Sequence, residues 1–175
     1  MSFDRTGFLD QVVASDQPWL DVELKTQRLW LRQGETTLLE FQISSALNGA
    51  GELNGSGCTP RGWHQVRAKI GAGAPNGAVF VGRRQTGELY DDALGRAFPE
   101  RDWILTRILW LSGLEPGFNR FGELDTMRRY IYIHGCPDTE PMGVPGSAGC
   151  IRLRNHELLD LFERTPVATP VLINE

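Results

Sequence analysis

A histidine and a cysteine that lie 16 positions apart are the residues of this sequence best suited to nucleophilic chemistry. His134 ends the apolar run Ile131–Ile133 and precedes Gly135, whereas Cys150 follows the small residues Ser147–Gly149. The loop between them is rich in Pro and Gly and is long enough to bring imidazole and thiol together. An imidazole can remove the proton of a thiol, whose free pKa is about 8.5, and small residues let backbone N–H groups approach a developing oxyanion. The pattern predicts a Cys-His nucleophilic site.

These two segments resemble the catalytic signature of the L,D-transpeptidase (YkuD) domain family. Residues Ile131–Gly135 match its I-H-G element, and residues Ser147–Leu153 match the pattern S-x-G-C-[IV]-R that follows it. Upstream, the segment Thr59–His64 resembles the family's T-P-x-G element, which opens a strand. Two positions depart from the family pattern: Cys136 replaces a Thr or similar residue, and Ala148 replaces a common His.

The resemblance spans roughly residues 19–175 and implies a cysteine nucleophile acting on peptidoglycan stem peptides. Cys150 would attack the carbonyl of the L,D-peptide bond between the L-centre of a diamino acid and a terminal D-Ala. His134 would be the general base, with its ring oriented by the carbonyl of Gly135. If this pair rests as thiolate and imidazolium, the thiol pKa should lie well below about 8.5.

The resemblance also implies supporting roles for three neighbours of the cysteine. The N–H groups of Gly149 and Cys150 would form the oxyanion hole, and Ser147 would order the turn. Arg152 would either position the loop or bind a substrate carboxylate. The remaining cysteines and histidines are expected to be structural, and these are Cys58, Cys136, His64 and His156.

Three other classes of site compete with this interpretation. A zinc site could be drawn from His134, Cys136, Cys150 and His156, but no pair has the short Cys-x-x-Cys spacing of structural sites. A papain-like peptidase has its cysteine ahead of its histidine, and here the order is reversed. A glycan-binding module would rely on exposed aromatics, whereas the five Trp are scattered. No cofactor and no metal are predicted.

Short apolar segments must position these residues. Strands are predicted where the pattern has period two or is nearly continuous, at Trp19–Leu24, Arg28–Arg32, Thr37–Ser44, Trp63–Ile70, Val79–Arg83, Tyr130–His134 and Val167–Ile173. Gly34 marks a hairpin turn within an N-terminal meander, and a helix is expected after the N-cap Asn155. The region 99–112 suits either a helix or a long strand.

The expected architecture is mainly β: mixed sheets or a sandwich with one or two short helices. A lead-in over residues 1–17, as a short helical arm or a loose segment, would precede a single catalytic domain over residues 18–175. The length of 175 residues with 41% hydrophobic and 23% charged residues fits one globular domain. The net charge is −4 and the 18 Lys and Arg are dispersed, which argues against nucleic acid or an anionic membrane as partner.

The location expected from the sequence is the cytoplasm. No basic and then apolar leader is visible, and three cysteines in 175 residues fit a reducing compartment. We therefore expect an L,D-carboxypeptidase that trims tetrapeptide stems, free or linked to a sugar or nucleotide, in peptidoglycan recycling. The alternative is an L,D-transpeptidase that cross-links or modifies peptidoglycan in the periplasm, if the natural chain is longer.

Overall fold

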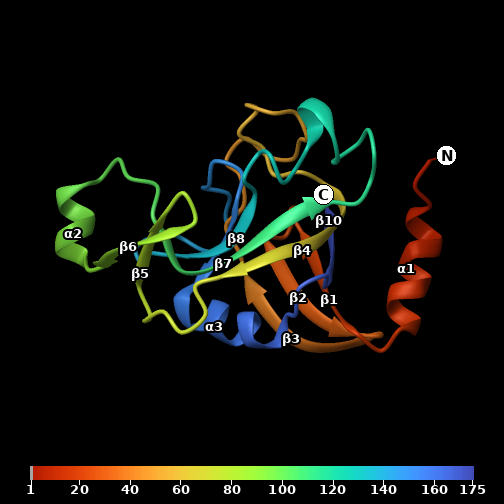
Figure 1. Ribbon diagram of the computed structural model, residues 1–175, viewed down its shortest axis with the longest axis horizontal. Coiled ribbons are helices and arrows are strands. Elements are labelled where there is room, and N and C mark those ends of the chain that lie inside the picture. The colour runs from red at the N-terminus through yellow and green to blue at the C-terminus, as the bar shows by residue number, and fades with distance from the viewer. Residues whose placement is uncertain (1) are drawn as a thin grey trace.

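The structure, a computed structural model, describes residues 2–175 and is built mainly from strands (Figure 1). The elements are α1 (Arg5–Ala14), β1 (Pro18–Glu23), β2 (Arg28–Gln33), β3 (Thr36–Gln42), β4 (Gly62–Ile70), β5 (Ala78–Val81), β6 (Arg84–Leu89), α2 (Asp92–Ala97), β7 (Ile104–Gly113), the 3₁₀ turn η1 (Gly122–Leu124), β8 (Tyr132–Cys136), β9 (Ile151–Arg154), α3 (Asn155–Arg164) and β10 (Pro170–Asn174). The mainly β class predicted from the sequence is confirmed.

The strands form one curled, mixed sheet that branches at β7. Along the main path the order is β3-β2-β1-β10-β4-β7-β5-β6, while β8 also pairs with β7 and carries β9 on its other side. The pairs β1–β10 and β8–β9 are parallel, and the other pairs are antiparallel. The branch makes β8 and β9 a short parallel pair supported by the longest strand of the protein.

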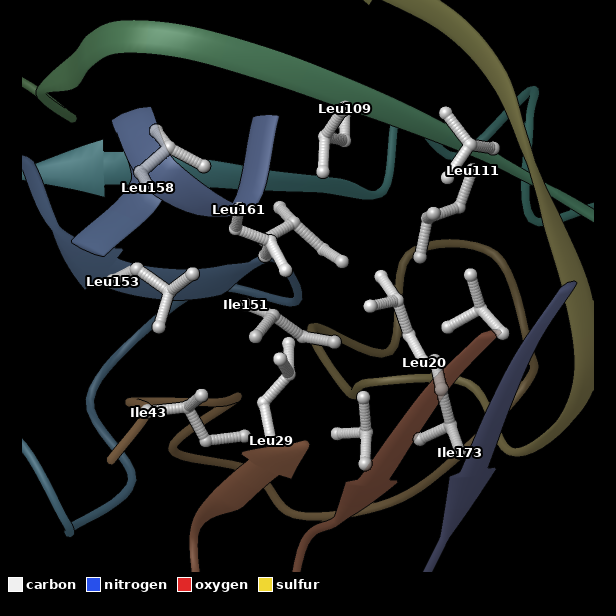
Figure 2. Close-up of a cluster of buried hydrophobic side chains, with 14 of the residues drawn as sticks. Leu20, Leu29, Ile43, Leu109, Leu111, Ile151, Leu153, Leu158, Leu161 and Ile173 are labelled. Carbon is white, nitrogen blue, oxygen red and sulfur yellow. The ribbon is translucent and has the colours of Figure 1, made fainter. Parts of the chain in front are cut away.

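The main hydrophobic core lies between this sheet and helix α3 (Figure 2). Leu158, Leu161 and Phe162 recur at helical spacing, so one face of α3 is apolar and buried. In Figure 2 the first two face Leu109 of β7 and Leu153 of β9. Burial of these side chains ties α3 to the strands that carry the candidate site.

Several predicted elements are confirmed by the structure. Strands β1, β2 and β3 pair in sequence order as the expected meander, with Gly34 in its turn at φ 56°. The ambiguous region 99–112 contains nearly all of strand β7, and most residues of this strand are buried. A strand buried on both faces lacks the alternating pattern that separates strand from helix.

Other features differ from the expectation. Residues 2–175 contain three α-helices rather than one or two, and α2 was not predicted. Strand β6 also carried no signal, because it is a largely exposed edge strand with polar residues. Asn155 is the first residue of α3 rather than its N-cap, and its carboxamide accepts a hydrogen bond from Thr106 at 2.7 Å. Tertiary bonding has taken the side chain that local capping would have used.

The N-terminal residues form a helix that packs on the sheet. In α1, Phe8 meets Trp63 of β4 edge to face, with ring centroids 4.8 Å apart. The boundary between a lead-in and the catalytic domain at residues 17 and 18 stays a prediction. No helix within residues 2–175 has the length and apolar character needed to cross a bilayer.

Candidate active site

The parallel pair β8–β9 places the predicted histidine and cysteine in one cleft. Ile133 pairs with Ile151, so Cys150, which directly precedes β9, lies beside Tyr132. The Tyr132 N–H donates to Cys150 Sγ at 3.3 Å. His134 is two residues further along β8 and therefore projects to the same face as Tyr132. Both Cys150 and His134 line a cleft of about 410 Å³.

His134 is held by a backbone carbonyl. Its Nδ1 lies 2.7 Å from the carbonyl oxygen of Gly135, which places the proton on Nδ1 and leaves the lone pair on Nε2. This is the orienting contact that the resemblance implied. A Cβ at position 135 would collide with Asn155 Oδ1 and lie 2.7 Å from the carbonyl oxygen of Leu105. The close packing behind β8 explains why glycine follows the histidine.

Hydrogen bonds to two hydroxyl groups hold the loop that carries the cysteine. Ser147 Oγ donates to the carbonyl of Cys150 and accepts from the Gly149 N–H at 3.2 Å. Thr59 Oγ1 donates to the carbonyl of Gly149 at 2.9 Å and accepts from the Ala46 N–H at 3.0 Å. The two Ser147 bonds fit the turn-ordering role that the resemblance implied. The threonine of the T-P-x-G element holds the same turn from outside.

The other predicted site residues lie nearby in different arrangements. The Gly149 N–H already donates to Ser147, so its oxyanion role stays a prediction and needs that N–H to change partner. Arg152 donates to Glu140 and to the carbonyl of Gly146, both at 3.2 Å, and approaches Asp102 at 3.5 Å. Of its two expected roles, these contacts fit loop positioning.

The surroundings of the pair favour its neutral form. Burial raises the pKa of the Cys150 thiol, and the hydrogen bond from Tyr132 opposes this incompletely. Burial likewise lowers the pKa of His134, although the Gly135 carbonyl opposes the shift. Burial therefore opposes a resting pair of thiolate and imidazolium, the state for which a thiol pKa well below about 8.5 was expected. Desolvation penalises the charged form of each group, and the two shifts therefore act in the same sense on the pair.

A comparison with protein families decides what this arrangement belongs to. Residues 17–173 match the family model of the L,D-transpeptidase catalytic domain, YkuD. The chain belongs to this family. The resemblance inferred from the motifs is thereby confirmed, and the family is one of cysteine enzymes of the L,D-transpeptidase type. No curated protein matches the sequence.

Solved structures show the same fold at low sequence identity. An L,D-transpeptidase from Mycobacterium smegmatis has a TM-score of 0.53 and 14% identity, covering 91% of this chain and 59% of that one. L,D-transpeptidase 3 from Mycobacterium tuberculosis has a TM-score of 0.55 and 14% identity, and the match covers 90% of this chain and 61% of that one. The Enterococcus faecium catalytic domain acylated by ertapenem has a TM-score of 0.50 and 20% identity, and the match covers 90% of this chain and 97% of that one. This YkuD domain therefore spans about three-fifths of the two mycobacterial structures and nearly all of the isolated catalytic domain.

The cleft of this YkuD domain contains charged residues that the sequence motifs did not indicate. Arg83 lies in the turn between β5 and β6, donates to the Tyr132 hydroxyl at 3.0 Å, and stacks on Tyr130 at 4.8 Å. Arg129 also lines the cleft, but its N–H groups donate to the carbonyls of residues 51, 52 and 58. Asp102 also lines the cleft. Arg83 and Asp102 lie far from the motifs in sequence, so no local signal could have found them.

The remaining cysteines and histidines do not line the cleft, although the Cys58 carbonyl accepts a hydrogen bond from Arg129, which does. Cys136 is buried, its thiol donates to the carbonyl of Leu153 at 3.4 Å, and burial raises its pKa to about 11. His64 is buried and His156 is exposed, and neither lines the cleft. Among residues 2–175 no three His, Cys, Asp or Glu side chains come together as metal ligands, so the zinc alternative has no cluster on which to rest.

Proposed function

We propose that this YkuD domain is a cysteine-dependent L,D-carboxypeptidase that removes the terminal D-Ala from peptidoglycan tetrapeptide stems. The observation that carries the proposal is a guanidinium group in the cleft of Cys150 and His134. Arg83 uses one N–H for Tyr132 and keeps further donors available. A carboxypeptidase must recognise a free terminal carboxylate, and a guanidinium group binds a carboxylate with two parallel hydrogen bonds.

The chemistry would proceed through a thioester. His134 Nε2 takes the thiol proton as Cys150 Sγ bonds to the carbonyl carbon, and backbone N–H groups stabilise the oxyanion. Collapse breaks the C–N bond, and the imidazolium donates its proton to the leaving amine of D-Ala. Water then attacks the thioester while His134 accepts its proton, a C–O bond forms, and the C–S bond breaks. The released thiolate recovers the proton from the imidazolium.

The stems would be free, sugar-linked or nucleotide-linked, and recycling in the cytoplasm is the expected setting. Incubation with a murein tetrapeptide, followed by mass spectrometry, tests the reaction. Free tripeptide and D-Ala support the carboxypeptidase, and absence of any turnover removes it. Fractionation of the source cells followed by immunodetection tests the location.

A second candidate is an L,D-transpeptidase that cross-links or modifies peptidoglycan in the periplasm. A further cleft shares Asp102, Ser147 and Ala148 with the catalytic cleft and also contains Glu100 and Glu140. Arg152 already meets Asp102 and Glu140, so Glu100 is the carboxylate of this cleft that would attract the amine of an acceptor stem. Cross-linked dimer in the same incubation, in place of tripeptide, supports this candidate over hydrolysis.

The role of Arg83 can be tested with a matched neighbour. Arg83→Gln should raise the KM for a tetrapeptide at least about tenfold, while Arg84→Gln, on the exposed strand β6, should not. A tetrapeptide amidated at its terminal carboxyl should be cleaved poorly by the wild-type protein and no worse by Arg83→Gln. Equal losses of Arg83→Gln on both substrates would contradict carboxylate recognition.

The nucleophile can be tested without a substrate. The Enterococcus faecium catalytic domain is described as acylated by ertapenem. Ertapenem should likewise add its mass to this protein at Cys150, and peptide mapping should find Cys58 and Cys136 unmodified. A covalent adduct in Cys150→Ala at the wild-type rate would contradict the assignment.

A further inference from the structure

A second cleft, of about 500 Å³, adjoins the catalytic cleft. Three arginines and three aromatic residues are among its lining residues: Arg67, Arg120, Arg128, Trp110, Phe121 and Tyr130. Tyr130 lines this cleft and the catalytic cleft alike. We call this feature the arginine cleft. Its composition differs from that of the chain as a whole, whose net charge is −4.

The three guanidinium groups of the arginine cleft are free to bind an anion. Within residues 2–175, none of the three forms an ion pair or donates a hydrogen bond from its side chain. The cleft has one acidic residue, Asp125, whose carboxylate accepts from the backbone N–H groups of Phe121 at 2.8 Å and Arg128 at 3.0 Å. Backbone donors therefore occupy the acid, and a positive excess remains beside the catalytic cleft.

Tyr130 connects the arginine cleft to the nucleophile. Its carbonyl oxygen accepts a hydrogen bond from Cys150 Sγ at 3.4 Å, while the residue as a whole is 53% exposed. The backbone of Tyr130 has φ 57°, a left-handed conformation that is costly for a bulky residue. The strain directs the carbonyl to the thiol and leaves the ring between the two clefts. A substrate held at Cys150 that extends across Tyr130 would enter the arginine cleft, because Tyr130 lines both clefts.

We propose that the arginine cleft binds an anionic group of the same substrate that is cleaved at Cys150. The inference rests on the proposed function and names the part of the substrate that lies away from the scissile bond. Two groups share the required chemistry: a carboxylate of the stem peptide and the diphosphate of a nucleotide-linked stem. Both accept parallel hydrogen bonds from guanidinium groups, and the aromatic residues offer faces on which a flat ring can stack.

Direct binding tests the arginine cleft independently of turnover. The cleft variant, Arg67→Gln/Arg120→Gln/Arg128→Gln, removes the three positive charges of the arginine cleft. The control variant, Lys25→Gln/Arg84→Gln/Arg96→Gln, removes three positive charges from residues outside the cleft. Calorimetric titration with inorganic pyrophosphate, and separately with the stem tripeptide, should show affinity at least about tenfold weaker in the cleft variant than in the control. A wild-type protein that binds neither probe, or equal affinities in both variants, overturns the proposal. This readout stands even if no stem is hydrolysed, so failure of the carboxypeptidase is distinguishable.

Kinetics with two substrates identify the source of the anion. The cleft variant should raise KM with kcat retained, and its kcat/KM should depend less on salt than that of the wild-type protein. A loss confined to the nucleotide-linked tetrapeptide assigns the diphosphate. Equal losses on the free and linked tetrapeptides assign a stem carboxylate. Unchanged KM values on both substrates overturn the proposal, and thermal melting checks that the exposed substitutions leave the fold intact.

Discussion

Two buried histidines in this protein make nearly the same hydrogen bond through Nδ1, but only one of them can act as a base. The Nδ1 of His64 lies 2.9 Å from the carbonyl oxygen of Gly62, and the Nδ1 of His134 lies 2.7 Å from that of Gly135. The Nε2 of His64 also meets Thr126 Oγ1 at 3.1 Å. Within residues 2–175, no hydrogen bond engages the Nε2 of His134, whose ring lines the catalytic cleft.

The difference between the two histidines lies in the second nitrogen. His64 is enclosed, and burial lowers its pKa to about 4, so it serves the fold as a neutral ring. His134 is equally desolvated, but its Nε2 keeps a lone pair in the cleft that Cys150 also lines. An orienting carbonyl is therefore insufficient to make a base, because a base also needs an unoccupied nitrogen that substrate or nucleophile can reach.

The largest effect should come from the thiol beside His134. Cys150→Ala should lower turnover of a tetrapeptide by at least about 10⁴-fold, because no nucleophile remains. Cys136→Ala and Cys58→Ala should retain activity, since those thiols lie outside the cleft. Mass spectrometry of the released tripeptide measures all three. Turnover by Cys150→Ala at a rate comparable to wild type would end the thiol mechanism.

The next largest effect should come from substituting the two histidines separately. His134→Ala should lower acylation by about 10²- to 10⁴-fold, because no group accepts the thiol proton. His64→Gln should keep most of the activity. Iodoacetamide alkylation of wild-type Cys150 should be slow at about pH 6 and rise towards alkaline pH, since burial favours the neutral thiol. Fast alkylation at about pH 6 would contradict this and show that the pair rests as thiolate and imidazolium.

A smaller effect should follow from crowding the strand behind His134. Gly135→Ala places a Cβ against Asn155 and the carbonyl of Leu105, which should destabilise the fold by about 1–3 kcal/mol and shift the imidazole. Urea unfolding and tetrapeptide turnover report the two consequences. Gly117→Ala is the control, because nothing lies within 4 Å of a Cβ there, although its φ of 76° adds strain. A Gly135→Ala protein as stable and active as wild type would contradict the packing argument.

The smallest effect concerns the structural histidine. A base whose folded pKa is about 4 binds fewer protons than the same base unfolded at about 6.5, so stability falls as pH drops through this window. Between pH 7 and pH 5, His64 should account for about 2 kcal/mol of lost stability. Urea unfolding of His64→Gln should therefore vary less with pH than that of the wild-type protein. Identical pH dependence in both proteins would show that His64 titrates normally.

The sequence by itself determined much of the local structure and the identities of the reacting residues. Period-two patterns and the turn glycine Gly34 specified the meander, since these signals depend on neighbouring residues alone. The segments around His134 and Cys150 specified the family, which the comparison with residues 17–173 confirms. The hydrogen bond from His134 to Gly135 was also foreseeable, because both groups belong to one motif.

Only the tertiary structure decided which distant groups surround these residues. Arg83, in the turn between β5 and β6, reaches Tyr132 of β8 across 49 positions of sequence, and the arginines of the arginine cleft come from separate segments. The direction of the Cys150 pKa shift likewise depends on burial by chain remote in sequence. Desolvation and charge proximity are sums over all neighbours in space, so no local pattern contains them. For this reason the motif was sufficient to identify the reacting pair, whereas the fold determined the direction of its pKa shifts and the charged residues around it.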